Sequence, residues 1–339
     1  MRVTSRFLAR ASTLFVALAT AGAVTCVAGP VAGATPAQPV ASGVSTHALT
    51  GAAATRAAAI ANYWTPQRML HAISADALVP ATSAPTGEAG GSGSGPAATL
   101  ARPHAAPTNR PQAAPTNRLQ STALNLSTAQ GKVFFHNPMD GYDYVCSGGT
   151  VNNPTKDMVF TAGHCVYNGG GGGWMTNWAF VPAYYNGSAP YGYWYANYMT
   201  TFNGWINNAD YNYDVGVVNV ASNGGNLLVN QVGGNGLNYN YGYSVTLTVW
   251  GYPASDGYDG QTPYYCYNLP TYQYGSRIKI GCSMTHGASG GSWLRAYDTG
   301  SGLGYVNGVT STAASPAGYI ASPYFDDKIG TIYGSTQNL

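Results

Sequence analysis

Two short stretches of this 339-residue chain, T-A-G-H-C at 161–165 and H-G-A-S-G-G-S at 286–292, decide its fold. The first places a histidine beside a cysteine, directly after the apolar run 158–160, and the second places a serine between glycines. Between them lies Y-D-V-G-V-V at 213–218. The order along the chain is therefore His, Asp, Ser, one of the three orders in which the catalytic triads of serine hydrolases occur.

The histidine of the first stretch is the best candidate for a general base. A serine hydroxyl is a weak nucleophile at neutral pH and needs a base within hydrogen-bond reach. Three histidines follow residue 118: His136, His164 and His286. His164 is favoured because it follows an apolar strand and precedes Cys165, whose disulfide would fix the turn.

The serine of the second stretch, Ser289, is the candidate nucleophile. Gly287 and Gly290 allow backbone shapes that residues with a Cβ resist, so the amides of Gly287 and Ser289 can converge to form an oxyanion hole. The pattern G-x-S-x-G also occurs in α/β-hydrolases, where the histidine follows the serine. No histidine follows Ser289, so that fold is excluded.

Two aspartates compete to orient the histidine. Asp214 stands at the head of the apolar run 215–220, where a buried carboxylate could face an imidazole. Asp210 lies in a polar, Asn-rich turn, where a capping role suits it better. The predicted triad is therefore His164, Asp214 and Ser289.

The cysteines indicate an exported chain with disulfides. Of the five, Cys26 lies in the predicted signal, and the remaining four allow three pairings. We favour Cys146–Cys165 and Cys266–Cys282 because each pair brackets a short segment. A zinc site is the alternative, but no C-x-x-C motif occurs, so no metal is predicted.

The first third of the chain is predicted to be a secretory signal followed by a pro-segment. Residues 1–34 combine a basic start, an apolar run and A-G-A at 32–34, as secretory signals do; a membrane anchor is the alternative. Residues 35–118 are predicted to be a pro-segment and linker, with helices over 52–64 and 67–77. Residues 80–118 are so rich in Pro, Ala and Gly that this segment is not expected to bury enough apolar surface to become ordered. The mature chain is expected to begin between about Arg110 and Lys132.

Charge is divided unevenly between these parts. Residues 1–118 hold eight arginines against Asp76 and Glu88, a net of +6, whereas residues 119–339 hold six basic and ten acidic residues, a net of −4. A mildly acidic domain argues against nucleic acid as a partner. A basic leader fits a pro-segment that docks on its own enzyme; the alternative is that the arginines serve only the signal and linker.

Residues 119–339 are predicted to be an all-β domain. Short β-prone runs alternate with Gly, Asn and Pro turns, a spacing typical of a sandwich or barrel. The expected strands are 133–135, 144–146, 158–161, 178–181, 215–220, 245–251, 278–282, 293–294 and 305–310. A helix is expected at 322–333. The dense aromatic cluster at 184–198 is either a binding platform or a loop that packs on itself.

The segment from about Lys132 to Tyr333 resembles the trypsin-like, chymotrypsin-fold serine proteases of bacteria, and the glutamyl-endopeptidase branch in particular. The similar motifs are G-H-C-V-Y-N at 163–168, Y-D-V-G-V-V at 213–218, G-Y-P at 251–253 and S-G-G-S at 289–292. The resemblance implies two six-stranded antiparallel β-barrels with the active site between them, a C-terminal helix, endopeptidase activity through an acyl-enzyme, and removal of a pro-segment. Y-W-T-P-Q-R-M at 63–69 is also similar to pro-regions of secreted actinobacterial relatives.

Two positions depart from these relatives. Ala288 stands where many trypsin-like enzymes have an aspartate that pairs with a freed N-terminal amine. Thr310 stands where glutamyl enzymes carry a histidine. The expected specificity pocket involves Ser283, His286 and Thr310, all without a negative charge. We therefore expect a neutral pocket, with Glu as the second choice, and no preference for Lys or Arg.

The sequence thus predicts a secreted, monomeric serine endopeptidase that acts on proteins or peptides and binds its own pro-segment. Triad chemistry needs no cofactor, and none is predicted. The alternatives are an inactive relative of the fold and a carbohydrate- or cell-wall-binding protein. A structural calcium at Asp140 and Asp143 is left open.

Overall fold

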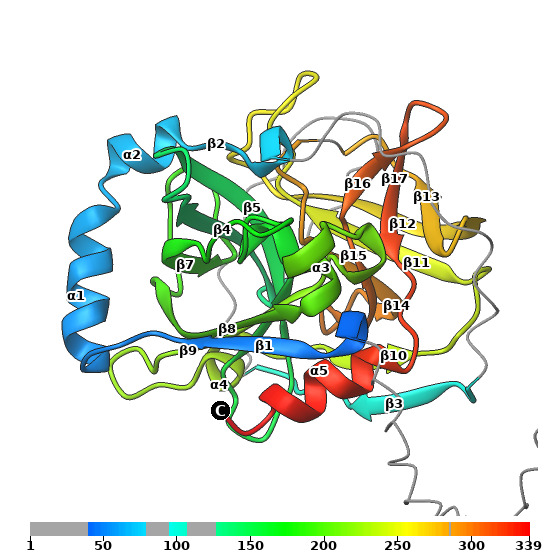
Figure 1. Cartoon of the computed structure of the whole chain (residues 1–339), viewed down its shortest axis with the longest axis horizontal. Helices are drawn as coiled ribbons and strands as arrows, with labels where there is room; N and C mark the ends of the chain where they lie inside the picture. Colours follow the sequence, from blue (N-terminus) through cyan, green and yellow to red (C-terminus); the bar gives the residue numbers. More distant parts are fainter. Residues whose placement is uncertain (1–39, 79–94, 107–126, 285) are drawn as a thin grey trace, which may run out of the picture. The chain divides into compact units, whose positions relative to one another are not determined.

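Six strands that follow residue 127 close into a barrel (Figure 1). The computed structural model describes residues 40–78, 95–106, 127–284 and 286–339, all within the unit Gln38–Leu339. The barrel order is β8-β7-β4-β5-β6-β9, and β9 pairs back onto β8. The strands are β4 (Gln130–His136), β5 (Asp143–Val151), β6 (Met158–Thr161), β7 (Thr176–Pro182), β8 (Trp194–Phe202) and β9 (Gly216–Val220). Trp178, Phe180 and Trp194 fill its core with Val133 and Val159.

A second sheet follows along the chain. Its order is β16-β17-β13-β12-β11-β14-β15-β10-β3. The strands are β3 (Ala98–Ala101), β10 (Gly236–Tyr239), β11 (Thr246–Gly251), β12 (Tyr264–Tyr274), β13 (Arg277–Gly281), β14 (Ser292–Asp298), β15 (Leu303–Val309), β16 (Thr312–Ala314) and β17 (Tyr319–Pro323). Six strands were expected, and β3, β10 and the short β16 extend the sheet beyond them. The β10–β15 pairing is parallel, because β10 lies in the connection from the first sheet and not in a hairpin.

Apolar side chains from both sheets meet in one further core. Phe160 and Val217 of the first sheet share it with Trp250 and Leu294 of the second and with Ile329 of α5 (Lys328–Thr336). The all-β class with two packed sheets and a C-terminal helix is thereby confirmed. The aromatic cluster at 184–198 contributes buried packing, since Tyr184 and Trp194 are 3% and 2% exposed.

The C-terminal helix begins six residues later than the sequence predicted. Residues 322–323 belong to β17, where Ser322 pairs with Ile278 and Pro323 with Arg277. The ladder to β13 holds this stretch extended. The Asp326 carboxylate then accepts a hydrogen bond from the Lys328 amide at 3.0 Å as the helix starts.

The leading segment, which we define as the described residues 40–78 and 95–106, lies against both sheets. Its elements before residue 79 are η1 (Val40–Ser42), β1 (Val44–Ala48), α1 (Ala53–Tyr63), α2 (Pro66–His71), β2 (Ile73–Ser74) and η2 (Ala75–Leu78). Its strands extend existing sheets: β1 pairs with β8, β2 with β5, and β3 with β10. Figure 1 shows β1 in dark blue along β8.

Two expectations for the leading segment were wrong. The helix predicted over 67–77 ends at His71, because Ala72 turns extended (ψ 128°) so that Ile73 and Ser74 can pair with β5. Residues 95–106 were expected not to order, yet β3 pairs with β10, whose backbone supplies the partners that composition does not reveal. The signal region 1–34 and the second copy of the A-A-P-T-N-R repeat lie outside the described residues.

The leading segment is anchored mainly by apolar side chains. Ile60, Trp64 and Met69 are each at most 6% exposed and join a core with Phe134 and Val145 of the barrel. Trp64 Nε1 also donates to the Asn177 carbonyl at 2.6 Å. Among the described residues, the ion pair that links this segment to the barrel is Arg68 Nε–Asp143 Oδ2 at 3.2 Å. Charge complementarity is therefore a minor part of the docking.

Candidate active site

The histidine and aspartate of the predicted triad form a buried pair. His164 lies in the short helix η3 (Gly163–Cys165) after β6, and Asp214 directly precedes β9. The Asp214 carboxylate lies 2.9 Å from His164 Nδ1 and accepts from the His164 amide at 2.8 Å. Ser311 Oγ donates to the same carboxylate at 2.6 Å. Asp214 is fully buried, so these contacts replace its water shell and fix the ring orientation of His164.

The charge around His164 favours its protonated form. Burial lowers the pKa of His164, but the charge and hydrogen bond of Asp214 and the charge of Asp76 raise it, and the net shift is upward. A base with a raised pKa keeps its proton to a higher pH. The nearby acids therefore control when His164 can accept a proton.

The serine loop takes the shape that its glycines permit. Gly287 and Gly290 have φ of +98° and +79°, in the left-handed region that side chains disfavour. A Cβ on Gly290 would lie 2.1 Å from Thr161 Oγ1, and one on Gly287 would lie 2.6 Å from the Tyr252 carbonyl oxygen. Both positions therefore require glycine. Ser289 between them is fully buried.

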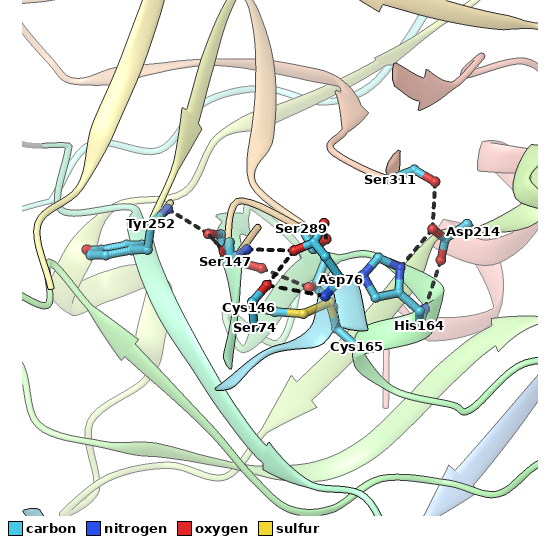
Figure 2. The surroundings of a disulfide bond; sticks show 12 residues. Ser74, Asp76, Cys146, Ser147, His164, Cys165, Asp214, Tyr252, Ser289 and Ser311 are labelled. Atoms are coloured by element: carbon cyan, nitrogen blue, oxygen red, sulfur yellow. Dashed lines mark hydrogen bonds and ion pairs between the residues drawn. A yellow bond between two sulfur atoms is a disulfide. The ribbon is translucent and has the colours of Figure 1, made fainter. Parts of the chain in front are cut away.

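One further serine, Ser147 of β5, fastens this loop to the barrel. Its amide donates to the Ser289 carbonyl at 2.7 Å, and its hydroxyl donates to the Gly287 carbonyl at 2.9 Å. The same hydroxyl accepts from the Tyr252 amide at 2.9 Å. The neighbouring Cys146 is bonded to Cys165, the residue after His164. The disulfide and Ser147 thus connect the serine loop to the turn that carries the histidine (Figure 2).

The two disulfides are Cys146–Cys165 and Cys266–Cys282, the pairing that the short sequence separations favour. The second lies in the other sheet and joins β12 to the residue after β13. Each closes a loop of fewer than 20 residues, which by the chain-entropy estimate contributes about 3 kcal/mol.

An acidic residue of the leading segment occupies the space in front of Ser289. The Gly287 amide donates to Asp76 Oδ2 at 2.6 Å, and Ser289 Oγ donates to Asp76 Oδ1 at 3.2 Å. His164 Nε2, the nitrogen that would take the serine proton, is buried and has no hydrogen-bond partner among the described residues. Figure 2 shows Asp76 beside Ser289, with Asp214 on the far side of the His164 ring.

The sequence did not single out Ser311, Ser147 or Asp76 for these contacts. Asp76 carried one signal, since it and Glu88 are the acidic residues of the first 118. Asp210, the competitor of Asp214, accepts from the Asn212 amide at 2.9 Å and caps η4 (Tyr211–Tyr213).

The three residues proposed for specificity have different immediate contacts. Ser283 is exposed, and its hydroxyl lies 3.2 Å from Tyr258 Oη, where both residues line a groove of about 550 Å³ beside the Cys266–Cys282 disulfide. Thr310 is 3% exposed and accepts from Trp293 Nε1 at 2.9 Å. His286 is exposed, with φ of +28°. Ala288 is buried, and its Cβ packs close to Gly251.

The aspartates considered for calcium bind protein donors. The Asp140 carboxylate accepts from Tyr144 Oη at 2.8 Å and from Asn137 Nδ2 at 3.0 Å. Asp143 contacts Arg68 and lies 2.9 Å from His136 Nδ1. Both carboxylates are thus committed to positive or neutral donors of the protein.

Comparison with solved structures places the fold among bacterial serine proteases. The protease Anisep from Arthrobacter nicotinovorans is 32% identical, with a TM-score of 0.59 over 63% of this chain and 97% of that chain. The thermostable serine protease AL20 from an extremophilic microorganism is 29% identical, with a TM-score of 0.58 over 62% of this chain and 98% of that chain. A Glu endopeptidase at 16% identity and a TM-score of 0.50, over 66% of this chain and 96% of that one, supports the fold alone.

Sequence comparison adds one curated relative. An "Extracellular metalloprotease" of Bacillus subtilis (strain 168) is 32% identical over 117 residues, which is 34% of this chain. The match spans about a third (36%) of the length of that relative. No known family profile matches this chain.

The donor atoms beside the histidine do not fit a metal ion. Within the described ranges, ligand-type atoms of Cys146, His164 and Cys165 lie within 4.8 Å of one another. The two sulfurs are joined in a disulfide and so are not thiolates, and His164 Nδ1 already contacts Asp214. These three residues therefore do not form a metal site.

Proposed function

Because this chain belongs to the chymotrypsin-fold serine proteases of bacteria, we propose that it is a secreted serine endopeptidase that uses Ser289, His164 and Asp214. The observation that carries the proposal is the buried chain of hydrogen bonds from Ser311 through Asp214 to His164. This chain faces the serine loop, whose Gly287 amide donates to a carboxylate from outside the loop. In the described residues no helix is both long and apolar enough to span a membrane.

The geometry supports acyl transfer. His164 Nε2 takes the proton of Ser289 as the hydroxyl attacks a peptide carbonyl, and the Gly287 and Ser289 amides hold the oxygen that becomes negative. His164 then gives the proton to the leaving amine, and a water molecule hydrolyses the acyl-enzyme. Asp214 keeps His164 in the tautomer with its proton on Nδ1 and stabilises the imidazolium.

Residues 35–118 are proposed to act as a pro-segment on this enzyme. Its strands extend both sheets, and Asp76 occupies the position that a substrate must reach. The mature chain then starts between about Arg110 and Lys132, and N-terminal sequencing of secreted protein tests this. A start near Thr35 would contradict it.

The proposed specificity is neutral and unlike that of trypsin. No carboxylate lies between Cys266 and Trp293, so this segment offers a cationic side chain no partner for its charge. A peptide-library profile of the mature enzyme tests this. A tenfold preference for cleavage after Arg or Lys over every other residue would refute it.

The activity itself is tested with an active-serine probe. The mature protein should react with a fluorophosphonate and cleave casein, and Ser289→Ala should do neither while keeping its near-UV circular dichroism. Ser335→Ala, on the exposed face of α5, is the matched control and should retain both. Absence of labelling in a folded mature protein would favour an inactive relative, and binding to insoluble glycans would favour the carbohydrate-binding alternative.

A further inference from the structure

Resting on the function proposed above, we propose that Asp76 is the inhibitory ligand of the active centre: its side-chain carboxylate fills the oxyanion hole and holds the Ser289 proton away from His164. The segment thus blocks the enzyme as an anion that mimics the reaction intermediate, and not as a slowly cut substrate. The proposal rests on two contacts to the Asp76 carboxylate, one from the Gly287 amide and one from the Ser289 hydroxyl.

The local structure presents Asp76 rigidly to the site. Ile73 and Ser74 pair in parallel with Tyr144 and Val145 of β5, next to the cysteine that bonds Cys165. Ser74 Oγ donates to Asp76 Oδ2 at 2.6 Å and accepts from the Asp76 amide at 3.3 Å. The turn η2 then begins with Ala75, which is fully buried.

The ligand has the charge that the hole is built to hold. An oxyanion hole stabilises a negative oxygen with amide donors, and hydrogen bonds to ionised acceptors are about twice as strong as neutral ones. The 2.6 Å contact from the Gly287 amide to Asp76 Oδ2 is of this kind. A peptide carbonyl in the same place would carry no full charge before attack.

Asp76 also prevents the Ser289 hydroxyl from acting as a nucleophile. Ser289 Oγ donates its proton to Asp76 Oδ1, so the proton does not point to His164 Nε2, which has no partner within the described part of the chain. The charge of Asp76 also stabilises protonated His164, which cannot act as a base. A carboxylate, finally, offers Ser289 no amine leaving group, so the occupant is not consumed.

The test uses the full chain and measures how fast Ser289 reacts with a fluorophosphonate in the uncleaved band on a gel. Wild-type full-length chain should react at least tenfold more slowly than the mature enzyme. Asp76→Asn, which keeps the shape, and Asp76→Ala, which removes the carboxyl group, should each speed labelling of the uncleaved chain about tenfold or more. Glu88→Gln, at the other acidic residue of the first 118, is the matched control and should label as slowly as wild type.

The outcomes separate this proposal from the proposed function. The Asp76 proposal fails if the uncleaved wild type labels as fast as the mature enzyme, or if a folded Asp76→Asn chain stays as slow as wild type. Retained near-UV dichroism of the Asn variant shows that fast labelling does not come from unfolding. If the mature enzyme does not label at all, the serine-protease function fails instead, whatever Asp76 does.

Discussion

Two carboxylates face the proposed catalytic residues His164 and Ser289 from opposite sides, and they are held in different ways. Asp214 is fully buried at the head of β9 and accepts hydrogen bonds from the His164 amide and Ser311 Oγ, both fixed within the domain that follows residue 127. Asp76 is half-buried and comes from the leading segment, with its neighbours supplied by β2 and η2. On the proposals above, Asp214 orients His164 permanently, whereas Asp76 blocks Ser289 until the leading segment is removed.

The largest expected effect is on the permanent carboxylate. Asp214→Asn should lower kcat of the mature enzyme by about 10⁴, because the amide favours the wrong tautomer of His164. Peptide hydrolysis by the mature variant measures this. Asp210→Asn, which changes the cap of η4, is the control and should stay within threefold of wild type; a similar loss in both variants would break the assignment.

The segment that carries Asp76 is expected to depend on Trp64 for its anchoring. Trp64→Ala should weaken docking of α1 and α2 by about 3 kcal/mol, since burial of a large aromatic side chain is lost, which is about 150-fold in exchange protection. Hydrogen exchange of these helices, in a full chain also carrying Ser289→Ala, gives the number. Leu70→Ala removes a side chain that is 64% exposed and should change protection less than threefold. Equal effects would show that the apolar contact is not the anchor.

A smaller effect is expected at Ser311. Its hydroxyl supplies a hydrogen bond to a buried charge, and removing one of several such bonds costs about 1.5 kcal/mol, or about tenfold in kcat/KM. Ser311→Ala should therefore retain far more activity than Asp214→Asn. An unchanged kcat/KM for the mature Ser311→Ala enzyme would mean that the amide and imidazole of His164 hold Asp214 without help.

The smallest effect is a titration shift. The charge of Asp76 helps raise the pKa of His164, so Asp76→Asn should lower that pKa in the full chain, again with Ser289→Ala to prevent cleavage. The proton would then leave His164 at a lower pH, and the base would be available over a wider range. NMR of the imidazole Cε1–H against pH measures the shift. A pKa that stays or rises would contradict the proximity of the two groups.

Much of the site was readable from the sequence because it depends on local rules. The serine loop needs glycine at 287 and 290, where φ is positive and a Cβ would clash. The histidine turn follows the apolar run 158–160 and has a cysteine beside it, and Asp214 precedes the apolar run 215–220. Such requirements leave a trace within a few residues.

The other contacts of the site could not be predicted from local sequence, because they join residues that are far apart in the chain. Ser311 reaches Asp214 across 97 residues, and Asp76 reaches Ser289 across 213. The helix predicted to run to Ala77 fails for the same reason, since the pairing of Ile73 and Ser74 with β5 outweighs local helix preference.

The sequence by itself determined the all-β class, the order of the three catalytic residues and the glycines that shape the serine loop, because each follows from neighbours along the chain. Only the tertiary structure decided which serines contact Asp214 and the serine loop, which strands the leading segment extends, and which carboxylate contacts Gly287 and Ser289. Hydrogen bonds and burial between distant residues carry that information, and neither leaves a periodic or local pattern in the chain.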